Sequence, residues 1–152
     1  MSLNNALNTV RNAIINNFSD FNANNCSIGD EAVFSYAETE VTANGHCCIV
    51  EYDGMNDVGG AEFAAATVQW RVLVNAFFRI EDTDYLSALS SARSFVDDFV
   101  RIVSTDTSSP SLDGSSLATA RVIDAGPMLT YKRGRHFYIL IPITVGVMDN
   151  IS

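Results

Sequence analysis

The chain has 152 residues, of which 47% are hydrophobic and 18% charged, and its 18 acidic and 9 basic side chains leave a formal net charge of −9. This length predicts a single domain, residues 1–152, with a core large enough to fold without disulfides. The negative charge repels a phosphate backbone and argues against a sequence-reading nucleic-acid binder, and no apolar run is long enough to predict a transmembrane helix. Because the Asn-rich start lacks a basic and apolar leader, we expect no signal peptide and synthesis in the cytosol.

The low charge has two explanations that the sequence leaves open. The charged share is below the typical value of about 25%. Neutral polar residues in the Asn-rich start and in a Ser/Thr-rich loop explain part of it. A surface partly hidden in an assembly would explain it equally well.

The first predicted element is a helix over residues 3–18. Its apolar residues recur at three- and four-residue steps and form one stripe, namely Leu3, Leu7, Val10, Ile14 and Phe18. Asparagine is a poor helix former, so we expect tertiary packing to hold this helix. The turn-prone residues 22–25 follow it, and residues 28–36 fit either a short strand or a turn.

A long hairpin is predicted next. Residues 46–52 fit a strand that follows the turn dipeptide Asn44-Gly45. Residues 53–60 contain three glycines and show little periodicity. We therefore predict a flexible loop over about 53–64 that forms the tip of a hairpin, and loops of this length usually serve binding or assembly.

The chain is organised around a long strand, residues 67–80, that leads into a long helix, residues 85–103. Alternate strand residues are apolar and share one face, namely Val68, Trp70, Val72, Val74, Ala76, Phe78 and Ile80. Leu73 and Phe77 interrupt the polar face, so we expect a partner strand, a helix or another subunit to cover its far end. The helix repeats its apolar residues at three- and four-residue steps, and Asp82 or Thr83 is the expected N-cap.

The C-terminal third is predicted to be mostly strand. A polar loop over about 104–116 precedes strands over 117–124, 128–132 and 136–148. In the last strand Phe137, Ile139, Ile141, Ile143, Val145 and Val147 share one face, and Pro142, which lacks an amide donor, suggests an edge position or a bulge. The complete pattern predicts an α+β fold, in which a mostly antiparallel sheet packs against an N-terminal helix and a long central helix.

One cluster, His46-Cys47-Cys48, hints at metal or thiol chemistry. A structural zinc site needs four converging ligands, and no second pair follows at a suitable spacing. A cysteine nucleophile with His136 as its base is an alternative that depends on the fold bringing them together. Because adjacent strand residues point to opposite faces, we interpret these thiols, with Cys26, as reduced core residues.

Two further groups have simple interpretations. Gly54, Gly59 and Gly60 lack the strand, glycine turn and helix order of a phosphate loop. Asp97 and Asp98 could attract a divalent cation, but such carboxylates are more often a solvated helix face. We therefore expect no catalytic residue, no metal, no cofactor and no enzymatic activity.

The one basic cluster of this acidic chain is Lys132-Arg133-Gly134-Arg135-His136. As a hairpin turn it would present several cations at one point, which suits an acidic patch on a partner or on a second copy of the chain. A charged turn that guards a sheet edge is the competing interpretation. The sequence does not decide between them.

The order of these elements resembles the small tail-terminator, or tail-completion, proteins of long-tailed bacteriophages. The resemblance covers nearly the whole chain. It depends on the segment Trp70-Arg71-Val72-Leu73-Val74, the helix over 85–103, the segment Leu112-Asp113-Gly114 and the closing strand over 136–147.

The resemblance implies an α/β sandwich that assembles into a homo-hexameric ring. In that family the ring caps the tail tube, ends its polymerisation and joins the head, so the implied partners are the tail-tube protein and the head-tail connector or neck proteins. DNA would pass through the lumen without sequence-specific binding, no membrane is involved, and the location is the virion tail after assembly in the host cytoplasm. We expect the interfaces to involve Lys132, Arg133, Arg135, Arg71, Arg79, Met55 and Val58.

Other functions remain open at this point. A neck or head-completion protein and a tail-tube subunit share the same general features, and no residue in the sequence separates them. A thiol- or metal-dependent enzyme that uses Cys47, Cys48, His46 and His136 is a less favoured alternative.

Overall fold

The computed structural model describes residues 3–29, 45–57, 66–80, 84–105, 120–133 and 136–151. In chain order these residues form α1 (Leu3–Asn17), β1 (Cys26–Ile28), β2 (Cys47–Asp57), β3 (Ala66–Ile80), α3 (Tyr85–Thr105), β4 (Ala120–Ala125), β5 (Leu129–Arg133) and β6 (His136–Ile151). The strands form one sheet in the order β1-β2-β3-β6-β4, and β5 also pairs with β6. The pairing of β1 with β2 is parallel, and the other described pairings are antiparallel.

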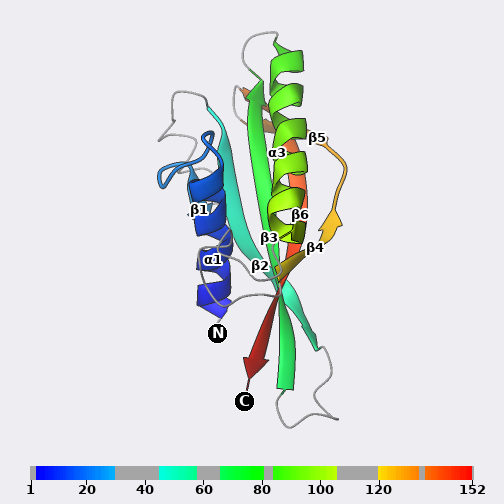
Figure 1. Cartoon of the computed structure of the whole chain (residues 1–152). Helices are drawn as coiled ribbons and strands as arrows, with labels where there is room; N and C mark the ends of the chain where they lie inside the picture. The colour runs from blue at the N-terminus through cyan, green and yellow to red at the C-terminus, as the bar shows by residue number, and fades with distance from the viewer. Residues whose placement is uncertain are drawn as a thin grey trace.

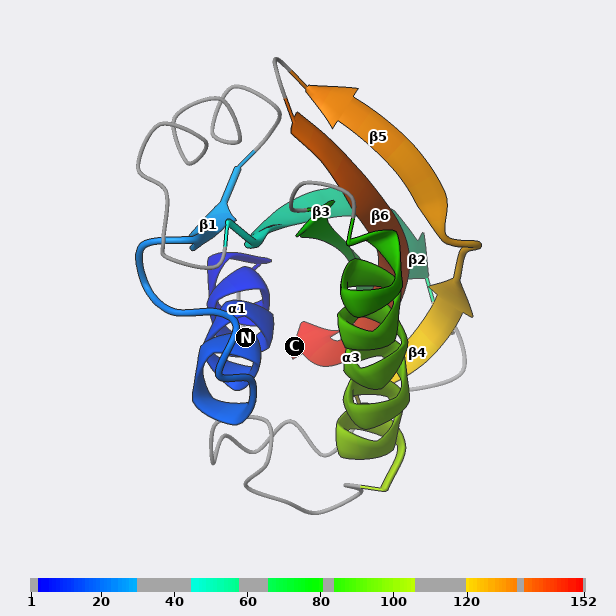
Figure 2. The same cartoon turned by 90° about the horizontal axis from the view of Figure 1, so that it is seen from above.

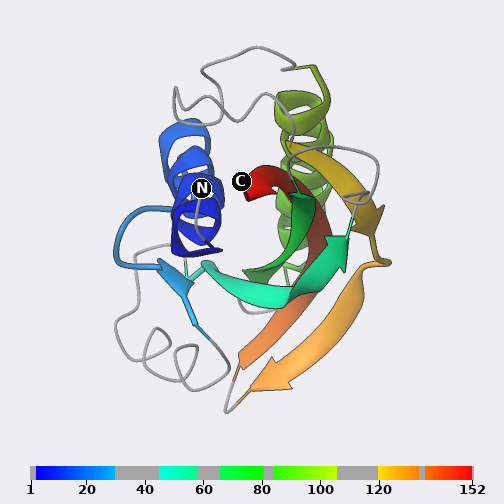
Figure 3. The same cartoon turned by 90° about the horizontal axis from the view of Figure 1, so that it is seen from below.

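The two helices lie side by side on the same face of the sheet and run in opposite directions (Figures 1 and 2). The sheet curves around them, so that its two edges bend toward the helix layer (Figure 3). This arrangement confirms the predicted α+β class, with a mostly antiparallel sheet and two helices.

The centre of the sheet is the long pairing of β3 with β6. It continues without a register shift from Ala66 opposite Ile151 to Ile80 opposite Phe137. The other edge of β6 is shared, since β4 pairs with residues 143–147 and β5 with residues 136–140. The two strands with the long alternating apolar pattern, β3 and β6, are therefore both interior strands of the sheet.

Pro142 lies in this interior strand, at the junction between β4 and β5. Its carbonyl oxygen accepts a hydrogen bond from the Gly126 N–H at 2.8 Å, so its backbone polar groups face the junction and not β3. The missing N–H therefore removes no bond from the central ladder. The prediction that Pro142 lies on an edge strand was wrong, because β6 is an interior strand. Pro142 does lie between the residues of β6 that pair with β4 and those that pair with β5.

The main core lies between the helices and the sheet. Its strand residues are the alternate set predicted from sequence, including Val72, Val74, Ala76, Phe78, Ile139, Ile141, Ile143, Val145 and Val147. The helices contribute Leu7, Val10 and Ile14 from α1 and Ala92, Phe95 and Phe99 from α3. Burial of this apolar surface holds the Asn-rich α1, as expected from its low helix propensity.

The helix α3 begins with a cap at Asp84. The Oδ1 atom of Asp84 accepts a hydrogen bond from the Ser87 N–H at 3.0 Å, which satisfies one of the free amides of the first turn. The start of the helix was predicted correctly. The predicted cap, Asp82 or Thr83, was wrong, because the next acidic residue takes that role.

Two predicted loops begin later than expected. Residues 53–57 continue β2 and residues 104–105 continue α3, while the remaining predicted loop residues, 58–64 and 106–116, lie outside the described residues. The pairing of β2 with β3 shifts register between Tyr52 and Met55, and Gly54 there has a φ of 106°. A strand that absorbs an extra residue at a glycine loses its alternation, which explains why the sequence pattern ended early.

Candidate functional site

The predicted basic contact lies at the end of the sheet where β5 leads into β6. Lys132 pairs in register with Phe137, and its Nζ atom lies 5.6 Å from the centre of the Phe137 ring. Lys132 is exposed, and Phe137 is 48% exposed. Arg133 is the last residue of β5, but its side chain and the whole of Arg135 lie outside the described part of the chain. The structure thus presents a cation above an exposed aromatic ring; we call this region the basic end.

The other predicted contact region lies on the paired arm of β2 and β3. These strands continue together as far as Asp57 and Val68 in register and project beyond the helices (Figure 1). Met55 on this arm is 47% exposed, whereas Val58 lies outside the described residues. Since Met55 pairs with Trp70 and the basic end adjoins Ile80, ten residues further along β3, the two regions are separated by about 33 Å. They lie at opposite ends of the sheet.

Two further arginines of the predicted interface are engaged within the fold. The Nη2 atom of Arg71 lies 3.6 Å from Oδ2 of Asp53, across the irregular part of β2. The backbone N–H of Arg79 donates a hydrogen bond to Nδ1 of His46 at 3.0 Å. The side chain of Arg79 covers Gly45, where a Cβ atom would lie 2.5 Å from its Cδ. Both arginines are only partly exposed and make these contacts within their own chain.

The face of the sheet opposite the two helices is apolar near the basic end. Cys47, Ile49, Phe77 and Tyr138 are buried there, with Tyr131 and Leu140 packed against them. The Phe77 ring lies 5.4 Å from that of Tyr131 and 6.1 Å from that of Tyr138. The expectation was that other groups cover the apolar residues Leu73 and Phe77 on this face. For Phe77 the cover is the rings of Tyr131 and Tyr138 on the neighbouring strands.

The same face becomes polar toward the arm. Asn75 donates a hydrogen bond from Nδ2 to Oε1 of Glu51 at 3.2 Å, and Asn56 donates one to Oε1 of Gln69 at 3.0 Å. Gln69 is only 3% exposed and leans over Gly146, which has no side chain to displace it. These pairs link β2 with β3 across the strands and stiffen the arm.

The cysteines and histidines do not form the thiol site considered above. Cys48 lies in the core under the helices and Cys47 on the opposite face, as predicted from their adjacency. Burial, followed by the neighbouring Cys26 thiol, raises the pKa of Cys48 well above its ordinary value, which disfavours the reactive thiolate. Cys47 is level with Leu140 of β6, so His136 is about 13 Å away along the strands and about 10 Å across them.

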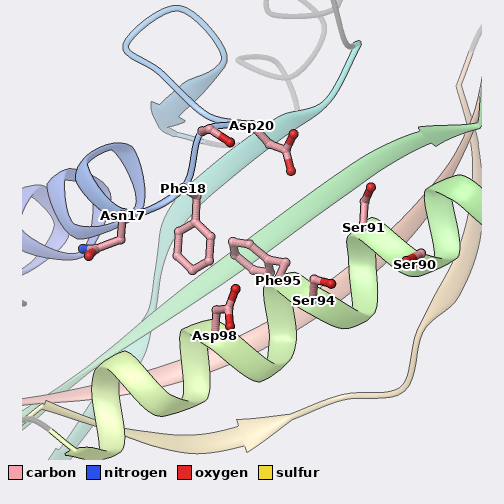
Figure 4. A pocket seen from close by; sticks show the side chains of 9 residues that line it. Asn17, Phe18, Asp20, Ser90, Ser91, Ser94, Phe95 and Asp98 are labelled. Carbon is pink, nitrogen blue, oxygen red and sulfur yellow. The ribbon is translucent and has the colours of Figure 1, made fainter.

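A pocket of about 270 Å³ lies between the end of α1 and the middle of α3 (Figure 4). The rings of Phe18 and Phe95, with centres 4.7 Å apart, form its apolar part. Asp20 lies on one side of these rings and Asp98 on the other, as Figure 4 shows, and three serines of α3 complete the lining together with Asn17 and Ser19. Sequence analysis missed this site, although the small polar residues at positions 90, 91 and 94 were a visible signal that this part of α3 is not covered by apolar packing.

The described residues contain no group of three or more His, Cys, Asp or Glu side chains arranged to hold a metal ion. Neither described helix is both long and apolar enough to cross a membrane. The sequence matches no family model and no curated protein. The interpretation of function therefore depends on the geometry above and on the resemblance noted from the sequence.

Proposed function

We propose that this chain is a structural protein of a bacteriophage tail, which forms a hexameric ring on the tail tube, ends tube polymerisation and provides the surface that joins the head. The observation that supports the proposal is that two chemically different exposed regions lie at opposite ends of one continuous sheet. The basic end exposes Lys132 above Phe137, and the arm exposes Met55. The part of β3 between Trp70, opposite Met55, and Ile80, opposite Phe137, is paired throughout with β6 and holds these regions apart.

Unlike regions on one subunit suit head-to-tail contacts between copies. A contact between two different surfaces closes into a ring when the rotation between subunits permits, whereas a self-complementary surface gives a dimer. A basic end on a chain with a net charge of −9 favours such pairing between unlike surfaces. The proposed ring has the tail-tube protein on one side and the head-tail connector or neck proteins on the other.

The acidic charge also suits the proposed place in the virion. A negative lumen would let DNA pass without adhesion, because it repels the phosphate backbone. In this proposal the chain needs no metal or cofactor and carries out no reaction. It assembles in the host cytoplasm and remains at the head-proximal end of the tail.

A tail-tube subunit is the second candidate, because the same two-ended sheet would also suit an open stack. The two candidates differ in one property, since a tube subunit adds to itself without limit and a terminator stops growth. A thiol enzyme has less support. Among the described residues Cys48 is buried with a raised pKa, and His136 lies far from Cys47.

The proposal is tested by polymerising the tail-tube protein of the same phage with increasing amounts of this chain. Electron microscopy should show shorter tubes as the amount rises, with added density at one end only. The triple variant Lys132→Glu, Arg133→Glu, Arg135→Glu should cap poorly, whereas Arg101→Glu, on an exposed part of α3, should cap normally. Unchanged tube lengths, or incorporation of this chain along the tube, would overturn the proposal.

A further inference from the structure

Two of the three cysteines face each other between the first two strands of the sheet. In the parallel pairing of β1 with β2, Cys26 lies directly opposite Cys48, and its thiol is close enough to hydrogen-bond to that of Cys48. Both belong to the main core and are 0% and 1% exposed. Cys47, the neighbour of Cys48, lies on the other face of the sheet in the separate cluster of Phe77 and Tyr138. The fold therefore brings one pair of thiols together and sets the third cysteine apart.

The spacing of Cys26 and Cys48 suits a disulfide. Neighbouring strands lie about 4.8 Å apart, so the Cα atoms of two residues in register have about that separation. Disulfides in proteins join residues whose Cα atoms are about 4.4–6.8 Å apart. Both side chains point to the helix face of the sheet, because both belong to the core beneath the helices. Rotation of the two thiols toward each other would therefore allow the Sγ–Sγ bond to form with little movement of the backbone.

Hydrogen bonds hold the backbone on both sides of the pair. The Cys26 N–H donates to the carbonyl oxygen of Asn22 at 3.0 Å, and Nε of Arg11 donates to the carbonyl oxygen of Cys26 at 2.8 Å. The Cys48 N–H donates to the carbonyl oxygen of Asn25 at 2.8 Å. These bonds tie the start of β1 to α1 and to β2. The folded chain has thus already brought together the two ends of the loop, residues 27–47, that a disulfide would close.

We propose that Cys26 and Cys48 form a redox-sensitive pair, which is reduced when the chain is synthesised and forms a disulfide between β1 and β2 in an oxidising medium. The cytosol keeps thiols reduced, whereas disulfides persist outside the cell. The oxidant is a small disulfide of the glutathione type. Its S–S bond breaks as one cysteine thiolate attacks, and the second cysteine then displaces the attached thiol from the mixed disulfide. The two cysteines lose two protons and two electrons, and two free glutathione thiols leave.

Burial of the pair sets the rate of this reaction. Burial, followed by the neighbouring Cys26 thiol, raises the pKa of Cys48, so the closed fold contains little of the thiolate that attacks. Exchange therefore passes through an opening that separates β1 from β2. β1 has only three residues and lies at the end of the strand order, beside α1 (Figure 2). Short elements of this kind open at a lower free energy than the whole domain, so oxidation is slow in the native protein but does not require global unfolding.

The adjacent cysteines supply a matched pair of variants. Cys47→Ala keeps the proposed pair, whereas Cys48→Ala removes it, and both substituted residues are buried. Each variant retains Cys26 and one partner at almost the same distance along the sequence, so the comparison asks whether the register of the strands selects the disulfide. After circular dichroism has shown that each variant is folded, the reduced proteins are incubated with oxidised glutathione at about pH 8, in buffer and in urea below the unfolding transition.

Mass spectrometry of a digest made without reductant identifies the bond. It should find a Cys26–Cys48 disulfide in Cys47→Ala and no Cys26–Cys47 disulfide in Cys48→Ala. The bond should form at least about tenfold faster in the urea, where β1 opens more often. Oxidised Cys47→Ala should melt about 6–12 °C above its reduced form, because the disulfide restricts the unfolded chain, and dithiothreitol should reverse the rise. Wild-type protein treated in the same way should show the same rise.

Three results would overturn this inference. The first is a Cys47→Ala chain that keeps both thiols after oxidation in the urea. The second is an equal yield of disulfide in Cys48→Ala, which would show that the register of β1 and β2 does not select the pair. The third is a wild-type chain whose melting temperature oxidation leaves unchanged or lowers. Both cysteines lie within one chain, so the disulfide and the capping of tail tubes are tested separately and can fail separately.

Discussion

Replacement of Asn25 by alanine should destabilise the fold more than its place in an Asn-rich turn suggests. Its side chain donates hydrogen bonds to the carbonyl oxygens of Asp20 at 2.8 Å and His46 at 2.9 Å, and it accepts one from the Asn22 N–H at 2.7 Å. Asn25 is only 2% exposed, so these groups have little access to water. At about 1 kcal/mol for each lost bond, Asn25→Ala should lower the free energy of unfolding by about 3 kcal/mol. For a chain of this size that corresponds to a fall in Tm of about 6–12 °C.

The assay is urea unfolding followed by circular dichroism, with a thermal melt as a second measurement. Asn24→Ala is the matched control, because the Asn24 side chain is exposed and its backbone N–H, which the variant keeps, makes the bond to Asn22. The control should change stability by less than about 0.5 kcal/mol. Asn25→Asp should be at least as harmful as Asn25→Ala at neutral pH, since a carboxylate would face two carbonyl oxygens. Equal small effects of Asn24→Ala and Asn25→Ala would refute the argument that Asn25 joins α1 to the start of β2.

Three further substitutions and conditions test other parts of the fold. Phe78→Ala should lower the free energy of unfolding in urea by about 3–5 kcal/mol, because the Phe78 side chain is fully buried between the sheet and the helices. Phe137→Ala, at a half-exposed position, should lower it much less. Similar losses for the two variants would show that the core is misassigned. Asp84→Ala should cost about 1 kcal/mol through loss of the α3 cap, and an unchanged midpoint would argue against that cap. Burial raises the pKa of the Cys48 thiol in the folded state, so this thiol ionises at lower pH in the unfolded chain, and the free energy of unfolding should fall as pH rises above about 8.5. For the same reason Cys48 should react with iodoacetamide much faster in urea than in the native protein. Rapid labelling of the native protein would contradict the burial of Cys48.

Periodicity predicted the central elements well, because burial selects residues by face. The alternation in β3 and β6 and the three- and four-residue steps in α3 follow the same geometry that places those side chains in the core. The local sequence pattern did not predict features that depend on a backbone irregularity or on pairing between residues distant in sequence. The strand through residues 53–57 was missed because a register shift at Gly54 breaks the alternation, and the parallel pairing of β1 with β2 depends on residues distant in sequence.

The candidate site shows the same division. The basic cluster was visible as a run of charge, and the structure places Lys132 at an exposed sheet end. The pocket was not visible, because Phe18 and Asp20 are about 75 residues from Phe95 and Asp98 and become neighbours only when α1 packs beside α3. Similarly, the sequence did not separate Asn25 from the other asparagines of its turn, since their roles depend on which carbonyl groups the fold brings near.

The mass of the protein in solution shows whether the chain forms a closed ring. Light scattering should be measured on a size-exclusion column over a wide range of protein concentration and at low salt. A closed hexameric ring should give a species of about 99 kDa, six times the 16.5 kDa chain, whose mass stays fixed as concentration rises. A mass that increases without limit would indicate a tube subunit, and a mass that remains at 16.5 kDa at the highest concentration would contradict the closed ring.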